Sequence, residues 1–509
     1  MSHRPIPTPG SPPPNTAVRP GGDRRARRRR TAAPAVLIAA VALLTGCGGS
    51  GHAATSPSSS ARSHANAPLP VRLPVPDGFT TTSGWSTAAG PETPDPQPGS
   101  SGFPLVAVAP HSGLVLVAAA DGSRLQAFSL TSGTLVWTFR PQALTNVQPG
   151  VFVQTAPDGN EEILFARQGQ TSGSGLSQSA PTVTVDVIPA NSHGTATAAH
   201  HIALPVPADS PVSFATTDTG FLVGTTNNGT DSQATVIDAA TGTTRAATTQ
   251  NLTVPDCGAS SCTVAASPAF ATSAGVVSAF QQTSGCDQWG TGSGAPCTTG
   301  FQVGTAWTST AVAPSGKHTG IPVAATGHYL VAAWHTSDTQ TDPPSLSSAQ
   351  PTEFTVQDLA TGKILAHVSC TSADQLTLQP GSAQSSTLTS PNGRYLISGQ
   401  VAFDLTTGTG HCYTSTATTK GIDLTAVGND GTAYGIIHTT DSTQANTLYG
   451  RLPIVQDAAD QPQRPGARVD LATGTATALD PAAQVPSYLA ADGSALFRTS
   501  NVLAVYPHS

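Results

Sequence analysis

The feature that most constrains the fold is a turn-and-strand pattern that recurs eight times along the chain. In each copy a turn ends in glycine and leads directly into a short apolar strand, as where Gly113 precedes LVLVAAA. The full set of turn glycines is Gly113, Gly159, Gly220, Gly275, Gly327, Gly393, Gly431 and Gly493. Their irregular but similar spacing indicates a unit of a few strands that buries its apolar faces only against neighbouring copies.

A second marker follows the first, namely a strand that ends in a turn resembling Asp-x-x-Thr-Gly. Repeat 2 has only a degenerate version near Gly194, and repeat 4 has none that can be recognised. The other copies lie at 129–133, 238–242, 358–362, 404–408 and 470–474. Two tight turns per repeat predict four short strands, and four-stranded sheets at such a period are typical of a β-propeller. We therefore expect an all-β propeller of eight four-stranded blades, or seven if one weak repeat is an insertion.

The last repeat predicts how the propeller closes. It has a turn at Gly493 and two apolar strands, SALFR and NVLAVYP, and then the chain stops without an outer strand. Residues 71–88 belong to no repeat and could supply that strand. An N-terminal outer strand would remove two open sheet edges, which otherwise invite aggregation.

Repeat 1, DGSRLQAFSLTSGTLVWTF, resembles the blades of the PQQ-like (quinoprotein-type) propeller family. In that family a strand ending in Asp-x-x-Thr-Gly leads to a strand carrying tryptophan, here Trp137. The resemblance extends over about residues 103–509, with only the first repeat keeping the tryptophan in that place. Quinone-dependent dehydrogenases of that fold carry an adjacent Cys-Cys disulfide, a stacking tryptophan and a calcium carboxylate cluster. This sequence has no Cys-Cys pair and no calcium cluster can be assembled from it, so we expect no cofactor and no metal.

The N-terminus is typical of an export signal with a lipid site. Six arginines between Arg24 and Arg30 precede an apolar run at 32–44, which is too short to span a bilayer and has the length of a signal-peptide core. The run ends in Leu44-Thr45-Gly46-Cys47, which resembles the bacterial lipobox and implies a diacylglycerol on Cys47. A plain secretory signal with an unrelated cysteine is the alternative. We therefore expect a signal peptide at 1–46, a lipidated Cys47 with a flexible Gly/Ser/Ala/Pro tether to residue 70, and the propeller at 71–509.

Charge limits the class of partner. After residue 46 the chain carries 14 basic and 28 acidic residues, which makes nucleic acid an unsuitable partner. The arginine bias and the Ala, Gly and Pro richness suggest a GC-rich genome and a Gram-positive cell. We expect a monomer lipid-anchored at the extracytoplasmic face of the cell membrane.

Six cysteines remain after Cys47, an even number in an exported chain. Spacing favours Cys257–Cys262 and Cys286–Cys297, which leaves Cys370 and Cys412 to join neighbouring repeats. A zinc site at Cys257 and Cys262 is the competing interpretation, but no second ligand pair of fitting spacing follows.

The longest connections share one face of the predicted propeller. They lie between the second and third strands of four repeats, at 168–181, 281–300, 335–351 and 438–465. Insertions confined to one face of a repeat protein indicate its binding face, although solvated loops without a role are the alternative for any one of them. The candidate partner-binding residues there are Trp289, His335, Asp338, Tyr449 and Arg451. Aspartates outnumber arginines in these loops, which favours a neutral or basic partner surface.

No catalytic motif was found: Gly-x-Ser-x-Gly, the P-loop, His-Glu-x-x-His and the EF-hand pattern are all absent from the sequence. The sequence therefore predicts a non-catalytic, surface-anchored scaffold that binds a protein partner through the long connections. By resemblance, such partners include membrane assembly machinery and sensor systems. The alternatives are a propeller oxidoreductase or lyase with a degenerate axial site, and a cell-wall carbohydrate binder resting on Trp289.

Overall fold

The computed structural model describes residues 71–88, 105–156, 158–172, 179–207, 212–217, 219–227, 231–247, 264–282, 299–316, 319–335, 352–370, 387–416, 418–437, 465–499 and 502–509. Within these ranges the chain is almost entirely β, with one short helix, α1 (Ser309–Val312). None of the helical structure described here is long and apolar enough to cross a membrane. The all-β prediction is confirmed.

Antiparallel pairing assigns all the described strands except β9 to eight groups of four, and strands that follow one another pair within each group. The first four groups are group 1 with β2 (Val106–Ala109), β3 (Leu114–Ala118), β4 (Leu125–Ser129) and β5 (Leu135–Phe139); group 2 with β6 (Thr145–Thr155), β7 (Glu161–Gln170), β8 (Pro181–Pro189) and β10 (His200–Pro205); group 3 with β11 (Val212–Thr217), β12 (Gly220–Asn227), β13 (Asp231–Ile237) and β14 (Thr244–Ala246); and group 4 with β15 (Val264–Thr272), β16 (Gly275–Gln282), β17 (Thr299–Val303) and β18 (Trp307–Thr308).

The remaining groups complete the series. They are group 5 with β19 (Thr319–Thr326), β20 (Tyr329–His335), β21 (Thr352–Asp358) and β22 (Ile364–Cys370); group 6 with β23 (Thr387–Thr389), β24 (Tyr395–Ser398), β25 (Val401–Asp404) and β26 (Thr409–Cys412); group 7 with β27 (Ile422–Val427), β28 (Thr432–Ile437), β29 (Gly466–Asp470) and β30 (Thr475–Ala478); and the closing group with β31 (Tyr488–Leu489), β32 (Ala495–Arg498), β33 (Val502–Tyr506) and β1 (Trp85–Ala88). Two parallel contacts join neighbouring groups. The outer strands β22 and β26 pair with each other, and β5 pairs with β9 (Gly194–Thr195), which lies in the connection between β8 and β10 of group 2.

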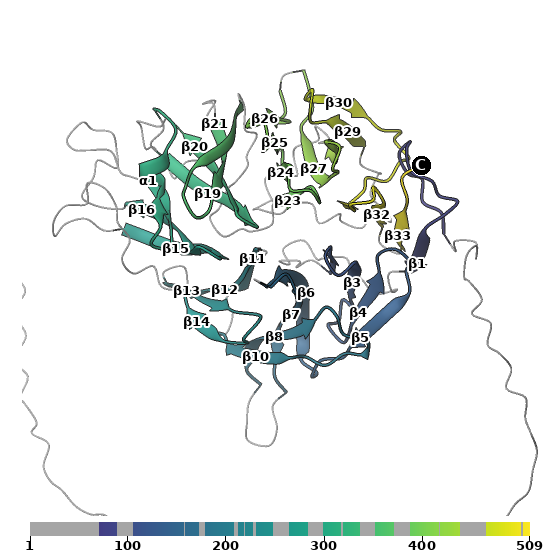
Figure 1. Ribbon diagram of the computed structural model, residues 1–509. Helices are drawn as coiled ribbons and strands as arrows, with labels where there is room; N and C mark the ends of the chain where they lie inside the picture. The colour runs from purple at the N-terminus through teal and green to yellow at the C-terminus, as the bar shows by residue number, and fades with distance from the viewer. Residues whose placement is uncertain are drawn as a thin grey trace, which may run out of the picture. The chain divides into compact units, whose positions relative to one another are not determined.

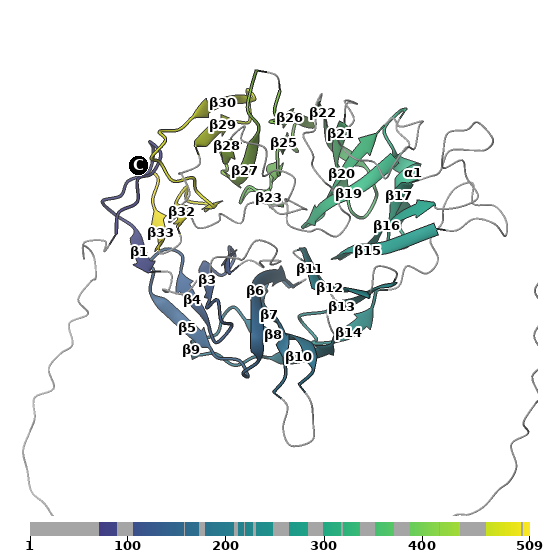
Figure 2. The same ribbon diagram turned by 180° about the vertical axis from the view of Figure 1, so that it is seen from behind.

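The apolar core lies between the groups, and each group packs against the next. Alternate residues of β7 illustrate the cause: Ile163 and Phe165 pack with group 1, whereas Leu164 and Ala166 pack with group 3. A strand buried on both faces fits between two sheets because its side chains point alternately to either side. Further clusters link groups 3, 4 and 5, then 5 and 6, 6 and 7, 7 and the closing group, and finally the closing group and group 1. The groups follow one another around a common centre (Figures 1 and 2), so the β-propeller is confirmed, while the blade number of the whole chain stays a prediction.

The N-terminal strand closes the series as the sequence predicts. β1 pairs antiparallel with β33, from Trp85 opposite Val505 to Ala88 opposite Val502. The outer strand of the closing group therefore comes from the start of the described chain and its other three strands from the end.

Most of the repeat glycines lie in the tight turns that the sequence predicts for them. Seven of the eight have a positive φ, a conformation that only glycine adopts without strain, and the second strand of each group follows the turn. Gly220 is the exception, because it begins β12, and a Cβ there would lie 2.3 Å from the carbonyl oxygen of Ala271 in the next group. This glycine is required by close packing between groups rather than by a turn.

Tryptophan occupies an equivalent place in three groups, which corrects the expectation that only repeat 1 keeps it. In each case the indole Nε1 on the outer strand donates to a backbone carbonyl in the third-to-fourth-strand turn of the next group: Trp85 to Leu130 (2.8 Å), Trp137 to Ala190 (3.2 Å) and Trp307 to Leu359 (2.9 Å). His200 makes the corresponding contact from group 2, with Nε2 lying 3.2 Å from the Ala240 carbonyl oxygen. Repeat 4 also has the turn that the sequence pattern missed, at Gly304 between β17 and β18.

Candidate functional site

The two ends of the propeller differ in the length of their connections. Antiparallel topology places the first-to-second and third-to-fourth turns of every group at one end, the short-turn end, and all other connections at the opposite, long-connection end. Connections at the short-turn end are tight turns, except in group 2, where β9 lies within the turn. At the long-connection end, β16 is joined to β17 through 283–298, β20 to β21 through 336–351, and β28 to β29 through 438–465. The predicted gathering of the long connections at one end is therefore confirmed.

Polar groups at the short-turn end are used to hold the turns. The Asp358 carboxylate accepts hydrogen bonds from the Thr361 backbone N–H (2.8 Å) and hydroxyl (2.7 Å), and Gly362 completes the turn with a positive φ. The Thr361 side chain is the main reason that the pKa of Asp358 lies below its usual value. Asp470 accepts from the Ala472 N–H (2.9 Å) in the same way, and this bond lowers its pKa. The Asp-x-x-Thr-Gly marker is thus a self-contained turn, which explains its recurrence without assigning it a ligand.

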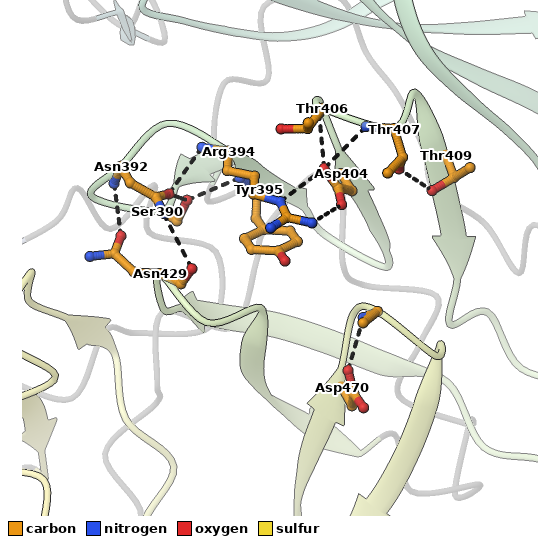
Figure 3. A network of polar contacts seen from close by, with 11 residues as sticks. Ser390, Asn392, Arg394, Tyr395, Asp404, Thr406, Thr407, Thr409, Asn429 and Asp470 are labelled. Atoms are coloured by element: carbon orange, nitrogen blue, oxygen red, sulfur yellow. Dashed lines mark hydrogen bonds and ion pairs between the residues drawn. The ribbon is translucent and has the colours of Figure 1, made fainter.

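Adjacent short turns are also linked to one another, as Figure 3 shows for groups 6 and 7. Asn392 donates its backbone N–H to Oδ1 of Asn429 (2.8 Å) and its side-chain amide to the Asn429 carbonyl (3.2 Å). Asn429 in turn donates to the carbonyl of Ala491 in the closing group (3.3 Å). In group 2, Glu161 accepts from the backbone N–H groups of two residues in the group 1 turn, His111 (3.1 Å) and Ser112 (2.7 Å).

An ion pair in this region joins two strands of group 6. Arg394 donates from Nε to Oδ1 of Asp404 (3.3 Å) and from a terminal nitrogen to Oδ2 (2.7 Å), while its guanidinium lies 4.8 Å from the centre of the Tyr395 ring. The hydrogen bond from Arg394 holds the pKa of Asp404 below its usual value, and the same bond raises the pKa of Arg394. Because Asp404 also accepts from the backbone of Thr406 (2.9 Å), the pair fixes the turn that follows β25.

Two adjacent histidines of group 2 have protein partners. Nδ1 of His201 lies 2.6 Å from Oδ1 of Asp186, whose other oxygen accepts from the buried Arg167 (3.1 Å). Burial lowers the pKa of Arg167, and the charge of Asp186 opposes that effect. With His200 bonded to Ala240, both imidazoles are held by hydrogen bonds within the protein. Among the described residues no group of His, Cys, Asp and Glu could hold a metal ion.

A disulfide stands at the long-connection end of groups 5 and 6. Cys370 ends β22 and Cys412 ends β26, and their sulfur atoms are bonded, which confirms the predicted link between neighbouring repeats. The two strands are also paired in parallel at His367 and Thr409. The disulfide therefore joins the outer strands of groups 5 and 6 covalently, at the point where the chain leaves β22 for the connection to β23.

The predicted partner-binding residues can be placed only in part. His335 ends β20 at the long-connection end, and its side chain is 6% exposed, so it contributes packing at the root of the following connection. Its role in binding stays a prediction. Outside the described residues lie Cys47, Trp289, Asp338, Tyr449 and Arg451, and also Cys257, Cys262, Cys286 and Cys297.

Comparison with known proteins identifies similar folds and no family. No protein-family description matches the sequence, and no curated protein does. Solved structures that match include BamB from Moraxella catarrhalis (12% identity, 78% of this chain and 82% of that chain, TM-score 0.28). A quinohemoprotein alcohol dehydrogenase from Pseudomonas putida matches at 13% identity over 66% and 62% (TM-score 0.27). An oligogalacturonate lyase in complex with manganese matches at 11% over 78% and 86% (TM-score 0.29). These values are too low for any of the three to indicate an activity for this chain, whose fold rests on its own strand pairing.

Proposed function

We propose that this protein is a lipid-anchored, non-catalytic scaffold whose propeller binds a protein partner through the long-connection end. The observation that carries the proposal is the contrast between the two ends. At the short-turn end, side chains such as Asp358 and Asn429 accept hydrogen bonds within a turn or between adjacent turns, whereas the other end carries long connections such as 438–465 between β28 and β29. A rigid body with its insertions on one side is the usual design of a repeat protein that binds through loops.

The anchor in this proposal comes from the sequence. Cys47 follows the basic and apolar segments of an export signal in the order that the lipobox requires. A diacylglycerol at that cysteine would hold the propeller at the extracytoplasmic face of the membrane, because two chains bind a bilayer far more firmly than one.

The test compares cross-linked partners captured from membranes by three proteins. One is the wild type, and one has 286–297 and 448–455 replaced by short Gly-Ser links. The third, a matched control, carries Lys363→Ser at the short-turn end, where Lys363 is exposed. We expect the shortened protein to fold and to lose a partner that the wild type and the control both capture. Equal capture by all three would rule out the long connections as the binding site. Stoichiometric binding of pyrroloquinoline quinone with calcium would favour the oxidoreductase alternative instead.

A further inference from the structure

Two exposed arginines are neighbours at the long-connection end of group 1. Leu125, the first residue of β4, pairs with Phe139, the last residue of β5. Arg124 and Arg140 are the next residues outward on these two strands, so they lie side by side across the end of the sheet, and both are exposed. Like charges that lie opposite each other destabilise a sheet. The stability of the fold therefore does not explain this pair.

The described residues give the two guanidinium groups no acidic partner. Neither side chain makes an ion pair or a hydrogen bond within the described ranges. Asp121 lies in the same connection as Arg124, but its carboxylate accepts from the Ser123 backbone N–H (2.9 Å). That hydrogen bond is the main reason that the pKa of Asp121 lies below its usual value, and the charge of Arg124 contributes less. The positive charge of the pair thus remains available to a group from outside.

Buried contacts with group 2 hold the backbone that carries the pair. The buried Arg167 guanidinium donates to the Gln142 carbonyl (2.6 Å) in the connection after β5, and it also donates to Asp186 (3.1 Å), which balances its charge. In the connection before β4, Gly122 has no room for a side chain, because a Cβ there would lie 2.5 Å from a methyl group of Val147. Both connections are therefore packed against group 2, and the two exposed guanidinium groups project from fixed backbone.

A third arginine lies at the same end in the closing group. Arg498 ends β32, and Leu496, two residues earlier on the same face of the strand, packs with Val115 of group 1. Arg498 is therefore on the face turned toward group 1. Among the described residues, this end of β32 and group 1 carries three arginines and one aspartate, Asp121. The local balance is positive in a chain that has 14 basic and 28 acidic residues after residue 46.

We propose that Arg124 and Arg140 bind a short acidic segment of the partner protein. This rests on the proposed function and names the chemistry of one contact at the long-connection end. The donors of a guanidinium match a carboxylate, and such charge-assisted pairs are the stronger hydrogen bonds in proteins. The acidic excess of the whole chain repels an extended polyanion or an anionic membrane, whereas a few carboxylates on a partner meet mainly the local positive charge. Opposite the long connections the sequence favours a neutral or basic surface, to which this contact adds an acidic element.

The test measures binding of a fluorescent hexaglutamate peptide to the full-length Cys47→Ser protein at low ionic strength. We expect Arg124→Gln/Arg140→Gln in this background to weaken binding about tenfold or more, because both charge-assisted contacts are lost. Arg245→Gln is the matched control, since Arg245 is an exposed arginine on β14, away from the pair, and it should bind like the parent. The urea midpoint of the double variant should not fall, because removing opposed like charges relieves repulsion. Equal peptide binding by the double variant would overturn the proposal.

Other probes and partner capture complete the test. Inorganic phosphate and phosphatidylglycerol vesicles are offered to the same proteins, and pair-dependent binding of either that exceeds peptide binding would overturn the acidic segment as the ligand. In the lipidated chain, loss of the captured partner with Arg124→Gln/Arg140→Gln but not with Arg245→Gln supports the proposal. Unchanged capture by the double variant overturns it and leaves the proposed function intact. Unchanged capture by the protein with shortened connections would instead overturn the proposed function, even if the peptide still binds the arginine pair.

Discussion

The buried polar side chains of this propeller affect stability according to whether their atoms have hydrogen-bond partners. Gln357 on β21 is fully buried, and neither its amide nitrogen nor its amide oxygen has a hydrogen-bond partner among the described residues. Burying such a group without a partner costs about 1–3 kcal/mol. We predict that Gln357→Leu raises the urea midpoint at an unchanged m-value. Gln302→Leu is the control, because the Gln302 amide donates to the Gly304 carbonyl (2.7 Å) and its loss should not stabilise. A lower urea midpoint for Gln357→Leu than for the wild type would contradict this prediction, because it would mean that the buried amide stabilises the folded protein.

The turn carboxylates predict how stability depends on pH. The pKa values of Asp358, Asp404 and Asp470 are all lowered in the folded protein, by the Thr361 side chain, by Arg394 and by the Ala472 N–H. Their stabilising effect is therefore complete above the unfolded pKa of about 4 and is lost as the pH falls through the lower folded values. Asp358→Asn should reduce the difference in stability between pH 6 and pH 3, measured by urea unfolding. Asp77→Asn, at an exposed carboxylate outside these turns, is the comparison, and an equal reduction there would contradict the explanation.

At the scale of elements, the closing strand depends on one indole. Trp85 is buried, and its Nε1 donates to Leu130 in group 1. Trp85→Phe removes this donor and leaves a buried carbonyl without it, so we expect a loss of about 1–3 kcal/mol in unfolding free energy. Ser86→Ala, on the same strand, should not lower the unfolding free energy, because the buried Ser86 hydroxyl has no partner in the described part of the chain to lose. Comparable losses in both variants would point to the strand as a whole rather than the indole.

The disulfide at the rim is the second element-scale prediction. Cys370 and Cys412 are 42 residues apart, and closing a loop of that length restricts the unfolded chain by about 4 kcal/mol in the chain-entropy picture. The double variant Cys370→Ala/Cys412→Ala should unfold at a lower urea concentration, and reduction should affect the wild type more than this variant. Thiol labelling of the denatured, unreduced wild type should find no free cysteine if all six pair, and two reactive thiols would exclude three bridges.

The strands and their contacts also show how much of the fold could be predicted from the sequence alone. The second strands and the closing strand were predictable, because positive-φ glycines and alternating apolar residues are local signals that survive without knowledge of neighbours. Trp307 was not predicted although Gly304-Thr305-Ala306-Trp307 resembles the turn before Trp137, because the residues before Gly304 lack the Asp-x-x-Thr pattern that marks the other turns. The links between Asn392, Asn429 and Ala491 also escaped notice because each bond joins different repeats. Most of the residues predicted to bind a partner at the long-connection end lie outside the described residues, so their role stays a prediction.

For the whole molecule, the proposed lipid anchor at Cys47 predicts where the protein is found in the cell. If Cys47 carries lipid, Cys47→Ser should move the protein from detergent-extractable membranes into the soluble fraction, because the variant lacks the thiol that the proposed diacylglycerol modifies. Cys370→Ala/Cys412→Ala is the control that alters cysteines without touching the anchor. Fractionation by immunoblot, with intact mass of the wild type before and after lipase treatment, measures the outcome. A Cys47→Ser protein that stays with membranes would show that something other than this lipid holds it.

The pairing of β1 with β33 has a consequence for the order of events during synthesis. Trp85 lies opposite Val505, so the contact joins residues that are 420 positions apart and are therefore synthesised far apart in time. β1 is synthesised long before β33. Until β33 is made, the backbone edge of β1 that pairs with it has no partner strand. Contacts of such long sequence separation form slowly, and incomplete sheets with open edges are prone to wrong pairing. A newly made chain thus carries an unmatched first strand for as long as the other groups take to appear, and any factor that shields β1 during that interval will raise the yield of closed protein.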